Sequence, residues 1–424
     1  MAYFNIAKAY LLNESYEKAL KYLPKALKVF RSLENDKKIG QTLMKLGEVS
    51  YKQGSFEQSK NYFKKSLDFV KASMDKKTLA FVHNELGLSY KQLNDYEKAF
   101  SEHRESMKLY SEIDDSAGIA SSISYIGSVY WKRGNYDSGK ASFKRTLKIR
   151  LAQNDTAGII NAYNNLGVIL KNQGKYETAI EYHKKALKFS RLKEWKEVEA
   201  SIYNYLGNIY LKLRVYEEAL RYYKNALNIH KSLNGVKQSA NIYNNLALLY
   251  RNKEKYDSAH FFFNKALEAR QEIGNKRLIA STYNNMGSMY RKMNLYDKAL
   301  SNYLQALEIR SEIGDRSGMA SSYNNIGTLY QNINNYKKAL EYYKKALRLK
   351  KERGNDKEIA YSLHIIGNSY LHLKKYDEAL KNYRQSLNLR KKIGDEFYIA
   401  QSMSNLGLVY EKMGDYDKAL SNFN

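Results

Sequence analysis

Asparagine residues recur along the chain at multiples of forty residues, and their side-chain amides are the groups that this spacing best suits to binding. An amide both donates and accepts hydrogen bonds, so a row of amides matches the backbone of an extended peptide whatever its side chains are. The row consists of Asn5, Asn165, Asn245, Asn285, Asn325 and Asn405. These six residues are the first candidates for a binding site.

Neighbouring residues are candidates for the same surface. A second set of asparagines stands one residue earlier in the period: Asn164, Asn204, Asn244, Asn284 and Asn324. Trp131, Arg251 and Arg291 share another position. Adjacent residues of a helix point about 100 degrees apart, so only one asparagine of a pair can face a ligand squarely. Two interpretations stay open, a ligand surface that varies between repeats and an abundant residue copied with the repeat.

No sequence pattern indicates a catalytic site or a metal site. The seven histidines are scattered over different positions of the period without metal-ligand spacing. There is no glycine-rich phosphate loop, nucleophile elbow or kinase signature. His103 and His183 stand at a position that is otherwise aromatic, so we expect packed imidazoles there. We predict no enzymatic activity, no metal and no cofactor.

The elements that position these residues follow from the forty-residue period. In residues 281–320, apolar residues at helical spacing predict one helix before a polar turn at residues 292–295 and a second helix after it. Gly314 suits a left-handed helix end, and Asp315 is placed to cap the next helix. Each repeat is therefore predicted to be a helical hairpin. Its first helix carries a glycine at a fixed position in nine repeats: Gly47, Gly87, Gly127, Gly167, Gly207, Gly287, Gly327, Gly367 and Gly407.

An aromatic residue at the start of each second helix gives a count of eleven repeats, from Tyr16 to Tyr416. Stacked repeats share one elongated core, so we predict a single domain over residues 1–424. The first repeat lacks its lead-in residues, and the last, residues 401–424, stops within its second helix. Because terminal repeats normally need a polar outer face, we expect the sequence to be a fragment.

This pattern resembles the tetratricopeptide repeat family, as Tyr283, Gly287, Tyr290, Ala299 and Tyr303 show for one repeat. The family's usual proline is absent and the repeat is longer than the common one, which is typical of a forty-residue-period subclass found in bacterial signalling proteins and polarity adaptors. The resemblance implies an all-α fold, a right-handed α-solenoid of about eleven helix-turn-helix hairpins. It also implies that the first helices line a concave groove, in which the second asparagine of each pair faces the ligand.

The resemblance further implies a protein-interaction scaffold that binds an extended or helical segment of a partner in that groove. The net charge of +27 favours an acidic protein or peptide as partner. Many basic residues fall on second helices and helix ends, among them Arg270, Arg310 and Arg390, and we predict that they face outward. No basic stripe with exposed aromatic rings stands out, so we do not expect nucleic acid as a partner.

The alternative is a sensory or regulatory region of a longer bacterial signalling protein, such as a histidine kinase or a DNA-binding regulator, whose effector domain lies outside this sequence. No run of eighteen apolar residues occurs, which predicts no membrane insertion within the chain. We expect a cytoplasmic protein, or a periplasmic sensor region if the sequence is a fragment. The sequence identifies neither the partner, nor its bound conformation, nor the oligomeric state.

Overall fold

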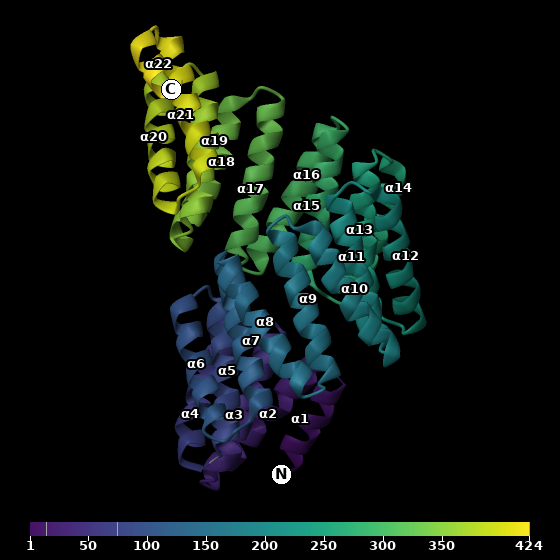
Figure 1. The fold of residues 1–424 in the computed structure, drawn as a ribbon. Coiled ribbons are helices and arrows are strands. Elements are labelled where there is room, and N and C mark those ends of the chain that lie inside the picture. Colours follow the sequence, from purple (N-terminus) through teal and green to yellow (C-terminus); the bar gives the residue numbers. More distant parts are fainter. Residues whose placement is uncertain (14, 74, 424) are drawn as a thin grey trace. The chain divides into compact units, whose positions relative to one another are not determined.

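The computed structural model of the protein describes residues 1–13, 15–73 and 75–423, with the side chains of residues 71–73 left out. The chain divides into two compact units, unit 1 (Met1–Val215) and unit 2 (Tyr216–Asn424), each described by itself. The described residues form twenty-two α-helices and no β-strand (Figure 1). The predicted all-α solenoid of helical hairpins is confirmed.

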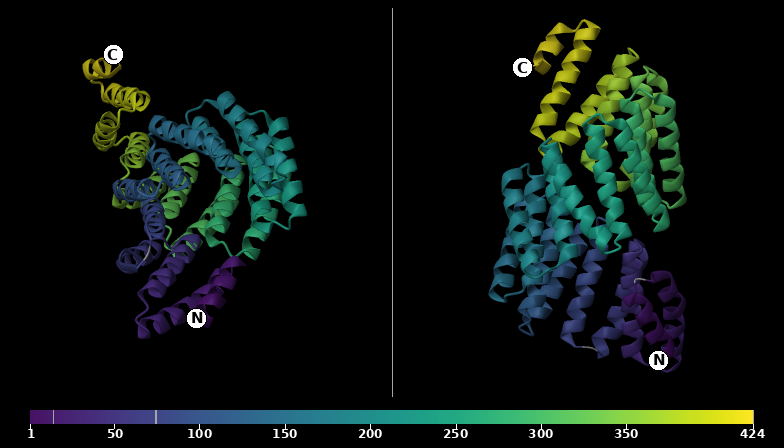
Figure 2. Two further views of the ribbon diagram at one scale, coloured as in Figure 1. Left: turned by 60° about the horizontal axis from the view of Figure 1, so that its bottom comes forward. Right: turned by 90° about the vertical axis from the view of Figure 1, so that its right-hand side faces the viewer.

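Unit 1 contains five hairpins and the first helix of a sixth. Successive helices lie side by side and run antiparallel, and each packs mainly on the helices before and after it in the chain (Figure 2). The helices are α1 (Ala2–Leu12), α2 (Tyr16–Ser32), α3 (Asp36–Lys52), α4 (Phe56–Ser73), α5 (Lys76–Gln92), α6 (Tyr96–Ser111), α7 (Ser116–Arg133), α8 (Tyr136–Ala152), α9 (Thr156–Asn172), α10 (Tyr176–Leu192) and α11 (Lys196–Lys212).

Unit 2 contains the second helix of the sixth repeat and five further hairpins. The hairpin α21–α22 ends with a short helix of eight residues. The helices are α12 (Tyr216–Ser232), α13 (Val236–Asn252), α14 (Tyr256–Glu272), α15 (Lys276–Lys292), α16 (Tyr296–Glu312), α17 (Arg316–Asn332), α18 (Tyr336–Arg353), α19 (Asp356–His372), α20 (Tyr376–Ile393), α21 (Glu396–Met413) and α22 (Tyr416–Phe423).

Local sequence signals fix where these helices begin and end. Gly314 has φ +65° and closes α16, a left-handed conformation that costs glycine little. The Asp315 carboxylate then accepts the Gly318 backbone N–H at 3.0 Å and so caps α17. Both predictions for this turn are confirmed. The same arrangement of a left-handed residue followed by an acidic or amide cap recurs at Asn154 and Asp155 in unit 1.

In most hairpins, the glycine at the fixed position of the first helix lies against a ring from the second helix. A methyl group on Gly327 would lie 2.6 Å from the Tyr343 ring, and one on Gly367 would lie 2.7 Å from the Tyr383 ring. In unit 1, His103 and His183 occupy the ring position and are buried, which confirms the prediction of packed imidazoles. In the repeats that carry this glycine, a side chain there would force the ring or the helix to shift, whereas Ala7 and Ala247 occupy the position in two other repeats.

The positions predicted for three basic residues are wrong. Arg270, Arg310 and Arg390 do not face outward but are only 4%, 7% and 3% exposed, and Lys350 at the equivalent position is 6% exposed. Arg310 donates to the Gly318 carbonyl oxygen at 2.8 Å and to Ser322 Oγ at 2.7 Å. Arg390 makes the equivalent pair of bonds to the Tyr398 carbonyl oxygen and to Ser402 Oγ. These cations thus lie between two repeats and connect one second helix to the next first helix.

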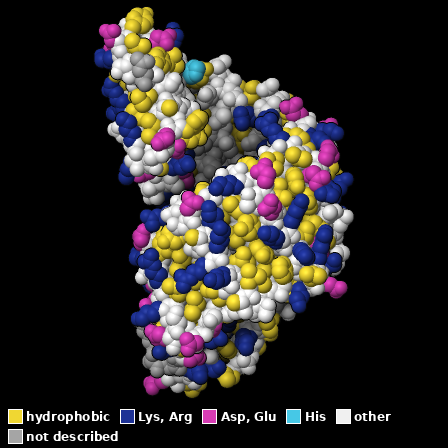
Figure 3. All heavy atoms as spheres, viewed as in Figure 1, with side chains coloured by type: hydrophobic (Ala, Val, Ile, Leu, Met, Phe, Trp, Pro, Cys, Tyr) yellow, Lys and Arg dark blue, Asp and Glu magenta, His cyan; other side chains and the backbone are white. Residues whose placement is uncertain are grey.

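The remaining basic residues are spread over the surface. Figure 3 shows Lys and Arg side chains scattered over the face in view, with acidic and apolar side chains among them. Several pair with acids on the other helix of their own hairpin, as Arg316 of α17 does with Glu352 of α18 at 2.8 Å and Lys392 of α20 with Asp356 of α19 at 2.8 Å. Within the described residues, no helix combines the length and the apolar character needed to cross a bilayer.

The contact between glycine and ring makes a testable prediction. Gly327→Ala should lower the free energy of unfolding by about 1–3 kcal/mol, because overpacking outweighs the better helix propensity of alanine. The Tyr343 ring cannot easily move, since it is fully buried and its hydroxyl donates to Gln331 at 2.8 Å. Urea titration followed by circular dichroism measures the change.

The chain itself supplies the control for this prediction. In the first repeat Ala7 stands at the glycine position and Leu23 at the ring position, and both are fully buried. In a Tyr343→Leu background, Gly327→Ala should therefore lose most of its penalty. An equal penalty in both backgrounds would show that the close contact with the ring is not its cause.

The buried cations make a second prediction. Arg310→Ala should cost about 2–4 kcal/mol of unfolding free energy, because it leaves a cavity and deprives the Ser322 hydroxyl and the Gly318 carbonyl of their donor. Arg310→Lys should cost clearly less, since Lys350 fills the equivalent position and donates to Ser362 Oγ at 2.8 Å. Thermal unfolding of both variants tests this, and similar losses for the two would contradict it.

Candidate functional site

The predicted row of asparagines lies on first helices in both units. Asn5 is on α1 and Asn165 on α9 in unit 1, while unit 2 carries Asn245 on α13, Asn285 on α15, Asn325 on α17 and Asn405 on α21. Asn5 is exposed, and the other five are half-buried. Ile365 interrupts the row on α19 between Asn325 and Asn405. The row is therefore most nearly continuous in unit 2.

Three members of the row contact the preceding repeat, and in Asn405 the partner of the amide nitrogen is the His364 ring at 3.4 Å. Asn285 Nδ2 donates to Asn244 Oδ1 at 3.1 Å, and Asn325 Nδ2 donates to Asn284 Oδ1 at 2.9 Å. Neither Oδ1 atom of Asn285 and Asn325 accepts a hydrogen bond from any described residue. These amides are thus held in place through one nitrogen while the carbonyl oxygen keeps its capacity to accept. A ligand that meets them there must donate, as the backbone N–H groups of a peptide do.

The first asparagine of each pair is turned toward its own hairpin or its neighbours. Asn164 Oδ1 lies 3.0 Å from His183 Nδ1, and Asn244 Oδ1 is 3.4 Å from an Arg270 nitrogen. Asn324 Oδ1 is buried without a partner among the described residues, and Asn204 is half-buried on α11. These residues support the row rather than extend it.

Sequence reasoning missed one residue of this first set. Asn84 Oδ1 lies 3.0 Å from His103 Nδ1, and its Nδ2 donates to Ser122 Oγ at 3.0 Å. Asn84 has the same position in the period as Asn164, which was the signal available. The pairing of a histidine ring with an asparagine at this position occurs in both repeats that carry the histidine.

The three other predicted neighbours are half-buried on the same faces. The Trp131 indole nitrogen is buried without a partner among the described residues, on α7 of unit 1. Arg251 on α13 donates to Asn252 Oδ1 at 3.3 Å, and burial lowers its guanidinium pKa. Arg291 lies one repeat further, on α15. Charge therefore reaches this face of unit 2 from two successive first helices.

In unit 1 the first helices form a cavity of about 530 Å³ where the asparagine row is absent. It is lined from α1, α3, α5 and α7, with Tyr16 of α2 at its side, and the position of the row is taken by Lys45, Glu85 and Tyr125. Sequence reasoning missed this cavity. The available signal was the break in the row at these three repeats, where charged and aromatic residues replace asparagine.

Some charged side chains of this cavity have an ion-pair partner and others do not. Lys45 Nζ pairs with a Glu48 carboxylate oxygen at 2.7 Å. The Glu85 carboxylate makes no hydrogen bond or ion pair with a described residue. Burial, helped by the nearby Glu48 charge, raises the pKa of Glu85 to about 7. Burial also lowers the pKa of Lys91, on the same helix, to about 8. A desolvated acid of this kind is characteristic of binding or catalytic sites.

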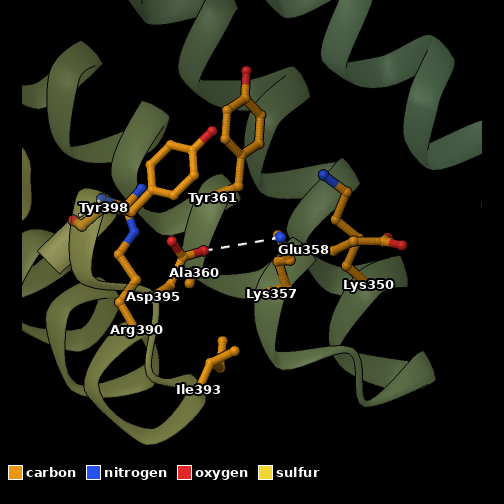
Figure 4. Close-up of a pocket in the computed structure, with 9 residues that line it drawn as sticks. All are labelled: Lys350, Lys357, Glu358, Ala360, Tyr361, Arg390, Ile393, Asp395 and Tyr398. Carbon is orange, nitrogen blue, oxygen red and sulfur yellow. Dashed lines mark hydrogen bonds and ion pairs between the residues drawn. The ribbon is translucent and has the colours of Figure 1, made fainter. Parts of the chain in front are cut away.

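A second cavity, of about 290 Å³, lies in unit 2 near the turns that follow α18 and α20 (Figure 4). Tyr361 and Tyr398 stand over it, and Lys357 faces Asp395 at 3.9 Å. The guanidinium of Arg390 lies 4.9 Å from the centre of the Tyr398 ring. Its charged groups are satisfied by one another and by the repeat contact described above, so we assign it no ligand.

Two histidines, His103 and His183, are packed inside their hairpins. In the part of the chain that the structure describes, no group of three histidine or acidic side chains could hold a metal ion. Burial lowers the pKa of His103 to about 3 and that of His183 to about 4. Both rings also pack on a tyrosine of the following first helix, Tyr125 and Tyr205 respectively.

The lowered pKa of His183 predicts acid sensitivity. The folded chain resists protonation of this ring, so its contribution to stability is complete above the ordinary pKa of 6.5 and is lost as the pH falls toward 4. His183→Phe copies Phe143 of the preceding repeat and removes the titrating ring. When the pH falls from 6.5 to 4.5, the variant should lose about 2 kcal/mol less unfolding free energy than the parent. Urea titrations at both pH values measure this difference.

The exposed His372 provides the matched control for this prediction. It stacks on Tyr336 at 4.4 Å. His372→Phe makes the same replacement on the surface, and the pH dependence of this variant is the reference against which that of His183→Phe is compared. A His183→Phe variant as acid-sensitive as the parent would contradict the assignment.

Comparison with protein families gives one result. A family model described as tetratricopeptide repeat matches overlapping stretches that cover nearly the whole chain. A search of curated protein sequences gave no significant match. The matched residues are 1–72, 38–112, 78–152, 118–191, 198–272, 278–352 and 358–424.

Solved structures share the fold at low sequence identity. Yeast Tom70 is 15% identical with a TM-score of 0.58, covering 97% of this chain and 96% of that one. The signal transduction ATPase PH0952 from Pyrococcus horikoshii, described as carrying a tetratricopeptide repeat sensor, is 20% identical with a TM-score of 0.54; the match covers 80% of this chain and only 51% of that protein. The Rap conjugation gene regulator of plasmid pLS20, solved in complex with the Phr* peptide, is 15% identical with a TM-score of 0.50, covering 66% and 75%.

Proposed function

The chain belongs to the tetratricopeptide repeat family, and on that premise we propose that it is a protein-interaction scaffold whose first helices bind an extended or helical segment of a partner. The observation that carries the proposal is the row of amides in unit 2. Asn285 and Asn325 are anchored through their nitrogens to the preceding repeat and keep their carbonyl oxygens for a ligand. Such a row forms hydrogen bonds with a peptide backbone whatever the side chains of the peptide are.

The energetics of this row suit reversible binding. A net hydrogen bond contributes about 0.5–1.5 kcal/mol, and ordering the partner segment offsets part of the gain. Because the amides are already held by neighbouring repeats, they lose little freedom when a ligand binds. Specificity must then come from the side chains around the row, such as Arg251 and Arg291, which differ between repeats.

Proteins with the same fold support the proposal by their described ligands. The Rap regulator of pLS20 was solved with a bound peptide, and PH0952 is described as using its repeats as a sensor. At these levels of identity the likeness concerns the fold alone. We propose a protein or peptide partner for this chain rather than nucleic acid, and no catalytic role.

The regulatory alternative uses the same binding face and differs in what the binding controls. In that case this chain would be the sensory part of a longer signalling protein. An immunoblot of the source cells distinguishes the two, since a band near 49.3 kDa indicates a free-standing scaffold and a clearly heavier band indicates the regulatory form.

The amide row makes a testable prediction. The Asn285→Ala/Asn325→Ala double variant should bind peptides selected from a randomised dodecapeptide phage library about tenfold or more weakly than the parent, because two backbone contacts are lost. Fluorescence anisotropy with the synthetic peptides measures the affinity. Circular dichroism confirms that the variant stays folded.

The matched control removes two amides from second helices. Asn302 and Asn382 donate to the Lys298 and Glu378 carbonyl oxygens within α16 and α20, both at 2.8 Å. Asn302→Ala/Asn382→Ala should leave peptide affinity unchanged. If the two double variants bind equally well, the amide row is not the peptide site.

A further inference from the structure

The cavity of unit 1 lies on the same first-helix faces as the proposed binding surface, but its chemistry is different. Where unit 2 presents amides, this cavity presents the Glu85 carboxylate. That carboxylate comes from the middle of α5 and is half-buried among side chains from α3 and α7. A buried acid without a partner costs free energy that a bound cation would recover.

The other charges of the cavity do not neutralise Glu85. Lys45 is engaged with Glu48 at 2.7 Å, while Lys8 and Lys52 are exposed. Glu48 faces the same space and adds a second negative charge near Glu85. The most deeply placed charges of the cavity are therefore negative, although the chain as a whole is strongly basic.

The walls of the cavity suit a long aliphatic side chain with a charged end. Val49 is fully buried and lies beside Leu11 and Leu88, which together form an apolar wall. Tyr51 and Tyr125 add aromatic rings close to Glu85. Tyr51 is held by a hydrogen bond from Gln92, and Tyr125 is packed on the His103 ring. Lysine and arginine bury their stems on apolar surface and favour aromatic faces beside an acid.

We propose that this cavity binds a lysine or arginine side chain of the partner segment, with the Glu85 carboxylate as its counter-ion and Glu48 beside it. The inference rests on the proposed function, because it assumes a partner segment along the first helices, and it names the residue class that unit 1 selects. A carboxylate from the partner would instead lie against Glu48 and Glu85 and be repelled. The cavity thus binds one basic side chain of the partner, while the amide row binds backbone groups.

Binding should be coupled to protonation of Glu85. The carboxyl has a pKa of about 7 in the free chain and must lose its proton to pair with a cation, so affinity should rise with pH through this range. Between pH 6 and pH 7.5 the ionised fraction rises about eightfold. The charged and titratable groups that face Glu85 are Lys45, Glu48, Tyr51 and Lys52 of α3, Lys91 of α5, Tyr110 of α6, Tyr125 of α7 and Lys8 of α1.

The experiment selects a randomised dodecapeptide phage library on the full chain, on Glu85→Gln and on the control Glu57→Gln. Gln keeps the shape of Glu and removes only its charge, and Glu57 is an exposed residue of α4 that pairs with Lys60. We expect lysine and arginine to be enriched on the parent and on Glu57→Gln but not on Glu85→Gln. A thermal melt shows whether each variant is folded.

A second measurement isolates the charge. The best lysine peptide is resynthesised with norleucine, which keeps the stem and lacks the ammonium group. On the parent this should weaken binding about tenfold or more at pH 7.5, and on Glu85→Gln the two peptides should bind alike. Affinity of the lysine peptide should rise about eightfold from pH 6 to pH 7.5 on the parent and stay flat on Glu85→Gln.

The outcomes separate this inference from the proposed function. The informative peptides are those that keep their affinity for Asn285→Ala/Asn325→Ala and therefore bind outside the amide row. If these peptides show no preference for lysine or arginine, or prefer acidic residues, the inference is overturned and the scaffold function stands. Equal binding of the lysine and norleucine peptides to the parent also overturns it. If no peptide is enriched on the parent chain, both proposals fail together.

Discussion

The close contact between a glycine of the first helix and a ring of the second determines how each hairpin of this protein is built. Gly327 against Tyr343 and Gly367 against Tyr383 leave no room for a methyl group, so the two helices approach as closely as backbone and ring permit. Two repeats depart from the pattern: one has Ala7 with Leu23, and the other has Ala247 with the Phe263 ring. Because the contact fixes the rotation of each first helix, it also fixes which residues that helix presents to a ligand.

The binding faces follow from that rotation. With the first helix in this orientation, the first asparagine of a pair points toward the ring of its own hairpin, as Asn164 does toward His183. The next residue then points toward the neighbouring repeat and the face that we propose for binding, as Asn325 shows with Asn284. The same position holds Glu85 in unit 1, so one backbone arrangement presents either an amide or an acid. A repeat protein of this kind changes its ligand chemistry without changing its fold.

The buried cations show that the charge of a residue does not by itself predict exposure to solvent. Arg310 and Arg390 stand in the last turn of a second helix, where a basic residue ordinarily faces solvent and complements the helix dipole. Here each folds inward and donates to a carbonyl and a hydroxyl of the next first helix. The long aliphatic part of the arginine side chain lets the guanidinium reach groups that lie in the next repeat. Their role is therefore to join repeats, and they contribute little to the surface that an acidic partner would meet.

The sequence by itself determined the hairpins, their number, their turns and the positions of the asparagines, because these depend on periodicity and on residues close together in the chain, such as Gly314 and Asp315. Tertiary structure alone decided which amide of each pair keeps a carbonyl oxygen to accept, that Arg270 and its equivalents are buried, and that Glu85 lies in a cavity without a partner among the described residues. The amide contacts depend on side chains about forty residues away, and the arginine contacts on groups 8 and 12 residues away in the next repeat. Their contacts arise only when repeats stack, and no local pattern encodes them.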